Sequence, residues 1–181
     1  MQFSDQRISI ATAQDIPSLK DLLNLAYRGE EAKKGWTSEA HLIAGDTRTD
    51  ENELDKLLKQ PGSLMLKWVD ADRIDACVNL QQKDNSVYLG MLSVSPLAQG
   101  AGIGKKLLKA AEEFAASQKC DRIYMTVITL RTELINWYKR HGYVDTGERK
   151  PFVEDAISGK HLQPLEFMVL EKLLHAKSIS V

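Results

Sequence analysis

The spacing of apolar residues changes within the first thirty positions of the chain. Residues 8–10 alternate between apolar and polar side chains, which is typical of a half-buried strand. Over 16–26 the apolar residues instead recur every three or four positions, which predicts an amphipathic helix. Thr12 and Asp15 have the spacing of a capping box, with Asp in place of the usual Glu, so we expect the helix to begin beside them.

The middle of the chain predicts a short helix followed by three strands. The helix is expected over 51–59, and Pro and Gly at 61–62 interrupt the chain after it. Runs that are typical of strands follow at 63–69, 74–82 and 87–94. The segments between them, "DADR" and "KDN", are short enough for hairpins, so we expect an antiparallel meander.

The second half of the chain alternates between helices and strands. Apolar residues at helical spacing over 103–115 predict a helix, and the mostly apolar run 121–129 predicts a strand buried on both faces. A second amphipathic helix over 132–142 ends at a glycine, and closing strands are expected at 143–149 and 165–173. A strand, a helix and a strand in this order imply a right-handed crossover with parallel pairing.

The length and composition favour one domain. The chain has 181 residues, of which 43% are hydrophobic and 27% charged, enough for one core but few for two. We find no internal repeat or linker. The predicted fold class is therefore α/β (α+β in the stricter sense), with a mixed sheet flanked by helices in a single domain over 1–181.

The charge and the cysteines narrow the class of partner. Lysine and arginine number 24 against 25 acidic residues, so no overall field favours nucleic acid or an anionic membrane. The N-terminus lacks a signal region, and no apolar run approaches the roughly 18 residues of a membrane span. Cys77 and Cys120 lie far apart without zinc-site spacing, which favours free buried thiols. We expect a cytoplasmic protein that binds a small molecule or a local protein partner.

One glycine-rich segment, "QGAGIGKKLL" at 99–108, precedes the third predicted helix. It is not a nucleotide P-loop, because Gln99 stands where the first glycine belongs and Lys106 where the magnesium-binding hydroxyl belongs. It is not a dinucleotide fingerprint, because Lys105 takes the place of the last glycine. Two interpretations are left: an anion held by backbone amides at a helix N-terminus, or a tight turn that needs positive φ.

The segment "LSVSPLAQGAGIGKKLLKAAEEFA", followed after one strand by "LINWYKRHGYVDTG", resembles the GNAT superfamily of acyl-CoA-dependent N-acetyltransferases. The family signature Gln/Arg-x-x-Gly-x-Gly/Ala is matched here by Gln99, Gly102 and Gly104. The family's later motif, an aromatic or apolar residue and Tyr followed by Gly-Phe/Tyr, is matched by Trp137, Tyr138, Gly142 and Tyr143. The predicted order of elements is similar to the family fold over about 7–174.

The resemblance implies an acyltransferase that uses acetyl-CoA as its co-substrate and needs no metal. The implied reaction moves the acetyl group to a primary amine of a small metabolite or peptide by direct attack in a ternary complex. An alternative is a non-catalytic acyl-CoA-binding sensor or scaffold module of the same fold. The four histidines lack metal-ligand spacing. Relatives occur as monomers and homodimers, so either state is expected, without nucleic acid or membrane as a partner.

The resemblance also assigns coenzyme contacts. Leu92 and Val94 would offer main-chain bonds to the pantetheine arm, and a backbone N–H at the same strand end would stabilise the oxyanion. The pyrophosphate would lie on the backbone amides of Gln99, Gly100, Ala101, Gly102, Ile103, Gly104 and Lys105. Arg131 stands where relatives often carry Asn, and it would replace that contact with the coenzyme by a charged one.

Tyr138 matches the family's general acid, a phenol that protonates the leaving thiolate. Its alternative role is aromatic packing beside Trp137 on an amphipathic helix. The strand segment "YLGML" has Gly90 and Met91 where many relatives place a carboxylate, so the sequence assigns no general base.

The resemblance implies that two segments bind the acceptor, one between the first helix and the second strand and one in the loop before the last strand. Trp36 suits a flat wall for a substrate, or equally a local core plug. Glu39 could attract an amine and Arg48 could bind a carboxylate. For each charged residue the alternative is a solvated surface pair.

Overall fold

The computed structural model describes residues 1–28, 38–154, 157 and 159–174 of the chain. In chain order the elements are β1 (Ile8–Ile10), the short 3-10 helix η1 (Ala13–Asp15), α1 (Ile16–Tyr27), α3 (Glu51–Lys59), β2 (Ser63–Asp70), β3 (Arg73–Lys83), β4 (Ser86–Val94), α4 (Ile103–Ser117), β5 (Arg122–Ile128), α5 (Thr132–Arg140), β6 (Val144–Pro151) and β7 (Glu166–Leu173). Each helix and strand that the hydrophobic pattern predicts is present.

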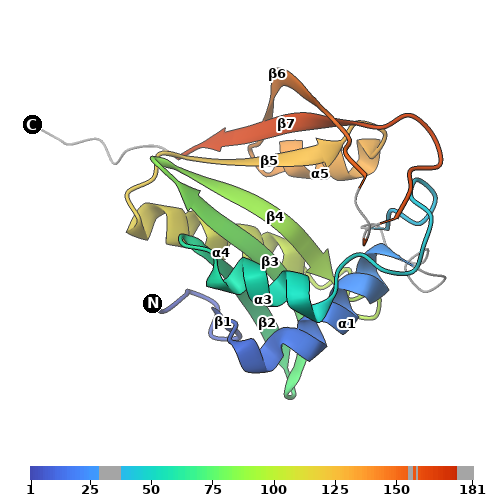
Figure 1. Ribbon diagram of the computed structural model, residues 1–181. Helices are drawn as coiled ribbons and strands as arrows, with labels where there is room; N and C mark the ends of the chain where they lie inside the picture. The colour runs from blue at the N-terminus through green and yellow to red at the C-terminus, as the bar shows by residue number, and fades with distance from the viewer. Residues whose placement is uncertain (29–37, 155–156, 158, 175–181) are drawn as a thin grey trace, which may run out of the picture.

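The seven strands form one mixed sheet in the order β1-β2-β3-β4-β5-β7-β6 (Figure 1). The strands β1 to β4 pair antiparallel, β5 pairs antiparallel with β7, and β7 with β6. The pair β4 and β5 is parallel, as the intervening helix predicts. The predicted meander, crossover and closing strands, and with them the predicted α/β fold class, are confirmed.

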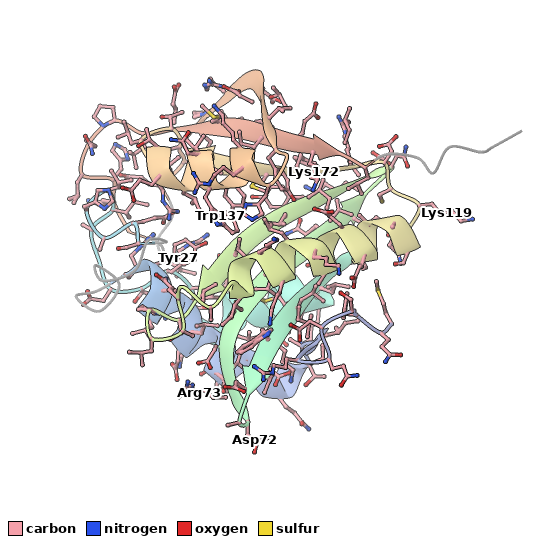
Figure 2. All side chains as sticks on the ribbon, turned by 180° about the vertical axis from the view of Figure 1, so that it is seen from behind. Tyr27, Asp72, Arg73, Lys119, Trp137 and Lys172 are labelled. Atoms are coloured by element: carbon pink, nitrogen blue, oxygen red, sulfur yellow. The ribbon has the colours of Figure 1, made fainter. Side chains whose placement is uncertain are left out.

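Helices cover both faces of the sheet. The helices α1 and α3 pack on one face around a core that includes Leu23, Leu54 and Met65. The helices α4 and α5 lie on the other face, in front in Figure 2, and share a larger core with β3, β4 and β5. Burial of apolar side chains on both faces is the main favourable term that holds these layers together.

Local interactions fix one end of each of three helices. The backbone N–H of Thr12 donates to the Asp15 carboxylate at 2.7 Å, which confirms the capping box, although it caps η1 and α1 follows directly. Asp50 accepts from the backbone N–H of Glu53 at 2.8 Å and so begins α3. Gly142 has φ of 92° just after α5, the left-handed conformation that glycine adopts most readily.

The strands β4 and β5 pair only at their beginnings. Residues 86–88 are in register with 122–124, and beyond them the two strands diverge (Figure 1). A bulge adds one residue to β4 between Gly90 and Ser93, where Met91 has φ of 53°. Because a bulge bends and twists its strand, it turns the second half of β4 away from β5.

Three details differ from or extend the sequence predictions. The predicted burial of β5 on both faces is wrong, because Tyr124 and Thr126, which share one face of the strand, are only half-buried. Cys77 and Cys120 are buried free thiols, as predicted. Among the described residues, no helix is long and apolar enough to span a bilayer.

Candidate active site

A cleft of about 600 Å³ opens between the glycine-rich segment and α5, and we call it the loop cleft. Its lining comes from the end of β4, the loop, the N-terminus of α4 and one face of α5: Val94, Ala98, Gln99, Gly100, Gly102, Ile103, Gly104, Lys105, Glu133, Asn136, Trp137 and Arg140. The cleft therefore contains most of the residues that the glycine signature singled out. Ala101 is exposed on the loop and does not belong to this lining.

The loop's backbone conformation leaves amides open to the cleft. Gly100 and Gly102 have φ of 88° and 71°, and a Cβ on either would meet nothing within 4 Å. The positive φ, and not crowding, is thus what favours glycine here. The N–H of Lys106 donates to the Gly102 carbonyl at 3.2 Å, so the N–H groups that precede it at the start of α4 lack an intrahelical acceptor. Together with the helix dipole, these amides suit an anion.

The α5 side of the loop cleft presents residues spaced three and four apart. Glu133, Asn136, Trp137 and Arg140 fall on one helical face, and Figure 2 shows Trp137 between α5 and α4. Sequence reasoning missed Asn136 and Arg140. The signal was available in the helical spacing, because Arg140 follows Asn136 by four residues and Trp137 by three, which places the three side chains on one face.

The carbonyl groups of Leu92 and Val94 accept hydrogen bonds from side chains and not from β3. The Tyr27 hydroxyl donates to the Leu92 carbonyl at 2.8 Å, and the Gln99 side-chain amide donates to the Val94 carbonyl at 3.1 Å. The N–H of Ser95 pairs with β3, so Val94 next to it faces the opposite way, toward the diverging gap. Gln99 thereby braces the loop against the end of β4.

A second cleft of about 190 Å³ opens where β4 and β5 diverge, and we call it the arginine cleft. Its polar lining comprises Tyr27, Arg28, Glu39, Arg48, Tyr88, Thr126, Arg131 and Tyr138, and its apolar lining includes Ile43, Ile128, Phe152 and Phe167. The two clefts follow one another along the same elements. Leu92 lines one and Val94 the other, and on α5 Tyr138 lines one and Trp137 the other.

Tyr138 stands at this junction. Its side chain is only 4% exposed, packed against the rings of Trp137 and Tyr143, yet it lines the arginine cleft. Its hydroxyl has no hydrogen-bond partner among the described residues. Burial raises the pKa of Tyr138 well above its usual value, Tyr27 adds to the increase, and Arg131 opposes it. The phenol is therefore protonated at neutral pH and can donate a proton.

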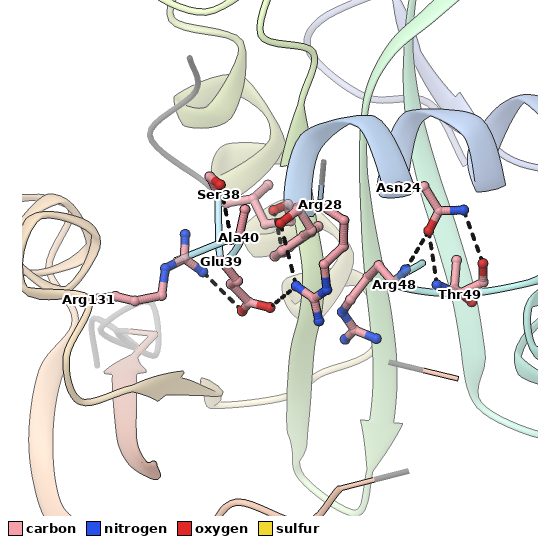
Figure 3. A network of polar contacts seen from close by, with 10 residues as sticks. Asn24, Arg28, Ser38, Glu39, Ala40, Arg48, Thr49 and Arg131 are labelled. Carbon is pink, nitrogen blue, oxygen red and sulfur yellow. Dashed lines mark hydrogen bonds and ion pairs between the residues drawn. The ribbon is translucent and has the colours of Figure 1, made fainter. Parts of the chain in front are cut away.

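Glu39 is held between two guanidinium groups, as Figure 3 shows. One carboxylate oxygen contacts Arg28 at 2.7 Å and the other contacts Arg131 at 3.3 Å. The three side chains are 12%, 1% and 7% exposed in that order, so the group is largely removed from water. The structure thus places Arg131 in the arginine cleft, and its expected contact with the coenzyme stays a prediction. Arg131 is directed to Glu39 because a buried guanidinium needs a nearby carboxylate.

Arg48 is positioned from its backbone. Its N–H and that of Thr49 both donate to the Asn24 side-chain oxygen, at 2.6 and 3.1 Å (Figure 3). The guanidinium lies over the ring of Tyr27, 5.6 Å from its centre, and is half-exposed in the arginine cleft. No ion pair joins it to an acidic side chain of the described residues. Trp36, the other predicted acceptor residue, lies outside the described residues.

In the part of the arginine cleft that the structure describes, no carboxylate is available as a base. Glu39 is the one described carboxylate in the arginine cleft, and both of its oxygens are engaged. Across the described residues, no three His, Cys, Asp or Glu side chains are grouped so that they could hold a metal ion.

Comparison with known proteins identifies relatives over part of the chain. The model of the acetyltransferase (GNAT) family matches residues 17–143. A spermine/spermidine N(1)-acetyltransferase of Bacillus subtilis is 36% identical over 67 residues, which are 36% of this chain and 44% of that protein. A thialysine N-epsilon-acetyltransferase of Mus musculus is 29% identical over 80 residues, 44% of this chain and 47% of that one. The chain therefore spans less than half the length of these relatives.

Solved structures share the fold at low sequence identity. The ribosomal-protein-S18-alanine N-acetyltransferase of Escherichia coli superposes with a TM-score of 0.70 at 13% identity, over 96% of this chain and 97% of that one. A putative streptothricin acetyltransferase of Bacillus anthracis, solved in complex with acetyl coenzyme A, gives a TM-score of 0.56 at 14% identity over 66% and 67%. At these identities the likeness concerns the fold alone.

Proposed function

This chain belongs to the acetyltransferase (GNAT) family, and we propose that it is an N-acetyltransferase that moves an acetyl group from acetyl-CoA to a primary amine of a small metabolite or peptide. The observation that carries the proposal is the pair of adjoining clefts with the Tyr138 hydroxyl at their junction. Two reactants that enter from opposite ends would meet beside this phenol. Direct attack in a ternary complex needs this arrangement.

In this proposal the loop cleft binds the coenzyme. The pyrophosphate lies on the backbone amides from Gln99 to Lys105, with Ala101 contributing backbone only. The side chains of Lys105 and Arg140 add positive charge to the same cleft, and Asn136 adds a hydrogen-bonding group. The pantetheine arm follows β4 past Val94 and Leu92 toward Tyr138.

The chemical step forms a C–N bond and breaks a C–S bond. The amine nitrogen attacks the thioester carbon, and a backbone N–H at the bulged end of β4 stabilises the oxyanion of the tetrahedral intermediate. When the intermediate collapses, the sulfur leaves as a thiolate and takes a proton from the Tyr138 hydroxyl, while the product amide loses the amine's extra proton to water. The Tyr138 phenolate then regains a proton from water, which restores the acid for the next turnover. Desolvation raises the pKa of the Tyr138 phenol, and it disfavours the thiolate as well. Because the same effect acts on both groups, the proton can still pass from the phenol to the sulfur.

The amine must arrive without its proton, and the arginine cleft favours that state. The guanidinium groups of Arg28, Arg48 and Arg131 outnumber the Glu39 carboxylate in the described lining. Like charges near a bound ammonium lower its pKa, which increases the fraction of free amine. This effect takes the place of a carboxylate base in the proposed mechanism.

The named relatives support an amine acceptor but not one class of amine. Their names refer to spermine or spermidine, to thialysine and to a ribosomal-protein alanine. All described strands lie in one sheet, which supports one functional domain over 1–181 with its core at about 7–174. The buried free cysteines agree with the proposed cytoplasmic location.

The test is the release of coenzyme A, followed with a thiol reagent, from the protein and acetyl-CoA across amino acids, polyamines, aminosugars and short peptides. The protein's own thiols should add little signal, because both are buried and burial raises the pKa of Cys77 to about 12. We expect release above the amine-free blank with at least one class. Acetyl-CoA binding without release by any amine would contradict the enzyme and favour the acyl-CoA-binding module.

A further inference from the structure

The charges of the arginine cleft point to one class of acceptor. The charged residues of its described lining are Arg28, Arg48, Arg131 and Glu39, so cations outnumber anions. We propose that the acceptor amine also carries an anionic group, a carboxylate or a phosphate, and that Arg48 binds this group. This inference rests on the proposed function, since it names the substrate class of the same site.

Arg48 is the cation in this cleft that the described structure leaves open to a ligand. Arg28 and Arg131 are both committed to Glu39, whereas no acidic side chain of the described residues pairs with Arg48. Arg48 is half-buried and lines the cleft, and its guanidinium carries a planar set of donors that matches the oxygens of an anion. The geometry therefore assigns the anion to Arg48 and not to its two neighbours.

The position of Arg48 is fixed before a ligand arrives. The Asn24 side chain accepts from the N–H of Arg48 and of Thr49, and its own amide donates to the Thr49 carbonyl at 3.2 Å. Thr49 is fully buried, so this contact holds the segment on α1. The ring of Tyr27 then supports the guanidinium. A side chain that is already ordered loses less entropy when it binds a ligand.

Glu39 contacts both Arg28 and Arg131, and the three side chains form a part of the cleft lining that does not bind the acceptor directly. Because each of its oxygens contacts a different guanidinium, Glu39 has little capacity left to bind an ammonium directly. We therefore assign Glu39 to positioning Arg28 and Arg131. A diamine in this cleft would bring a second positive charge toward three guanidinium groups, and that repulsion disfavours it.

The size and the apolar wall of the arginine cleft also fit such an acceptor. The cleft volume of about 190 Å³ and the apolar wall of Ile128, Phe152 and Phe167 fit a short carbon chain between the amine and the anion.

Equilibrium binding tests the inference without relying on turnover. Calorimetric titrations into the CoA-loaded protein would use ω-amino acids of increasing length from glycine upward, each matched with its amide, its phosphonate analogue and the diamine of the same length. At the best chain length we expect the acid or the phosphonate to bind at least about 10-fold tighter than the amide, and the diamine to bind weakest. The affinities of the acid and of its phosphonate analogue show which of the two anions the site prefers. Equal binding of acid and amide, or tighter binding of the diamine, would overturn the proposal.

Two variants connect the preference to Arg48. Arg48→Met keeps a side chain that packs on Tyr27 but removes the charge, and we expect the ratio of acid to amide affinity to fall close to one. Arg48→Lys keeps the charge but not the planar fork, and should retain part of the preference. Both should keep the thermal stability and the acetyl-CoA affinity of the wild type, because Arg48 lies outside the loop cleft. An unchanged ratio in Arg48→Met would contradict the proposal.

Coenzyme A release measured on the same compounds separates this inference from the proposed function. Binding of the acid with no release would contradict the acetyltransferase but support the anion site. Release that is equally efficient with acid, amide and diamine would support the acetyltransferase and overturn the anion site. Release with a higher kcat/KM for the acid or phosphonate supports both.

Discussion

The two clefts adjoin along β4 and α5, yet different kinds of groups line them. In the loop cleft, most of the lining comes from one continuous segment, 99–105, in which glycines have positive φ and the first amides of α4 lack an intrahelical acceptor. In the arginine cleft, charged side chains from α1, the following segment and the start of α5 meet across the diverging strands. The first surface depends on conformation and the second on pairs of side chains, so substitutions should damage them in different ways.

The largest expected effect is at Gly102, where a carboxylate would meet the bound pyrophosphate. We expect Gly102→Glu to weaken acetyl-CoA binding at least about 100-fold, equivalent to about 2.7 kcal/mol. The matched control is Gly102→Gln, which carries the same strain at positive φ and meets the same open space but lacks the charge. Calorimetry should show a much smaller loss for the control at equal thermal stability. Similar affinity of the two variants would contradict the assignment of the loop.

The next effect concerns the phenol at the junction. We expect Tyr138→Phe to lower kcat about 100-fold, the lower end of the range for loss of a general acid. Acetyl-CoA affinity should not change. The control is Tyr143→Phe, because the Tyr143 hydroxyl is buried without a partner among the described residues and lines neither cleft. That control should keep the wild-type kcat and gain about 1 kcal/mol of stability. Equal rates of Tyr138→Phe and wild type would show that Tyr138 only packs.

A third substitution separates stability from binding in the arginine cleft. We expect Glu39→Gln to lower the free energy of unfolding by about 3 kcal/mol, because it removes the carboxylate that contacts two buried guanidinium groups. Acceptor KM should rise while acetyl-CoA affinity is maintained. The exposed pair of Glu148 and Lys150 supplies a control, and Glu148→Gln should cost less than about 1 kcal/mol in denaturant unfolding. A similar cost for both variants would contradict the role of Glu39 in holding Arg28 and Arg131.

The smallest effect is expected on the exposed face of α5. Arg140→Gln removes one cation from the loop cleft, and we expect a rise in acetyl-CoA KM of about 5-fold, since a single exposed charge contributes about 1 kcal/mol. The difference from wild type should shrink as salt concentration increases. Lys139→Gln, one residue before it and absent from the cleft lining, is the matched control. An equal rise in KM for both variants would mean that the overall charge of the protein, and not a contact in the loop cleft, determines the effect.

The sequence predicted the loop cleft far better than the arginine cleft, for a physical reason. Glycines at 100–104 before a helical pattern report a local backbone conformation, so a short window of sequence is enough. Periodicity likewise predicted each element of the sheet. The contact of Glu39 with Arg28 and Arg131 joins positions 11 and 92 residues apart, which no local pattern records.

Two features of the site were outside the reach of pattern reasoning. The bulge at Met91 has positive φ on a residue other than glycine, so nothing in the letters "YLGML" indicates it; it exists because the register with β3 shifts there. Arg131 contacts Glu39, 92 residues away in the sequence, and no motif around Arg131 indicates that partner. By contrast, Asn136 and Arg140 could have been found from the helical spacing around Trp137.

We propose that the loop cleft and the arginine cleft receive different reactants. Hydrogen exchange of the wild-type protein with and without coenzyme A tests this directly, because amides at the start of α4 have no intrahelical acceptor and should exchange fast when free. We predict that coenzyme A slows exchange over 99–106 and leaves 38–49 unchanged. Slower exchange over 38–49 with no change over 99–106 would contradict it.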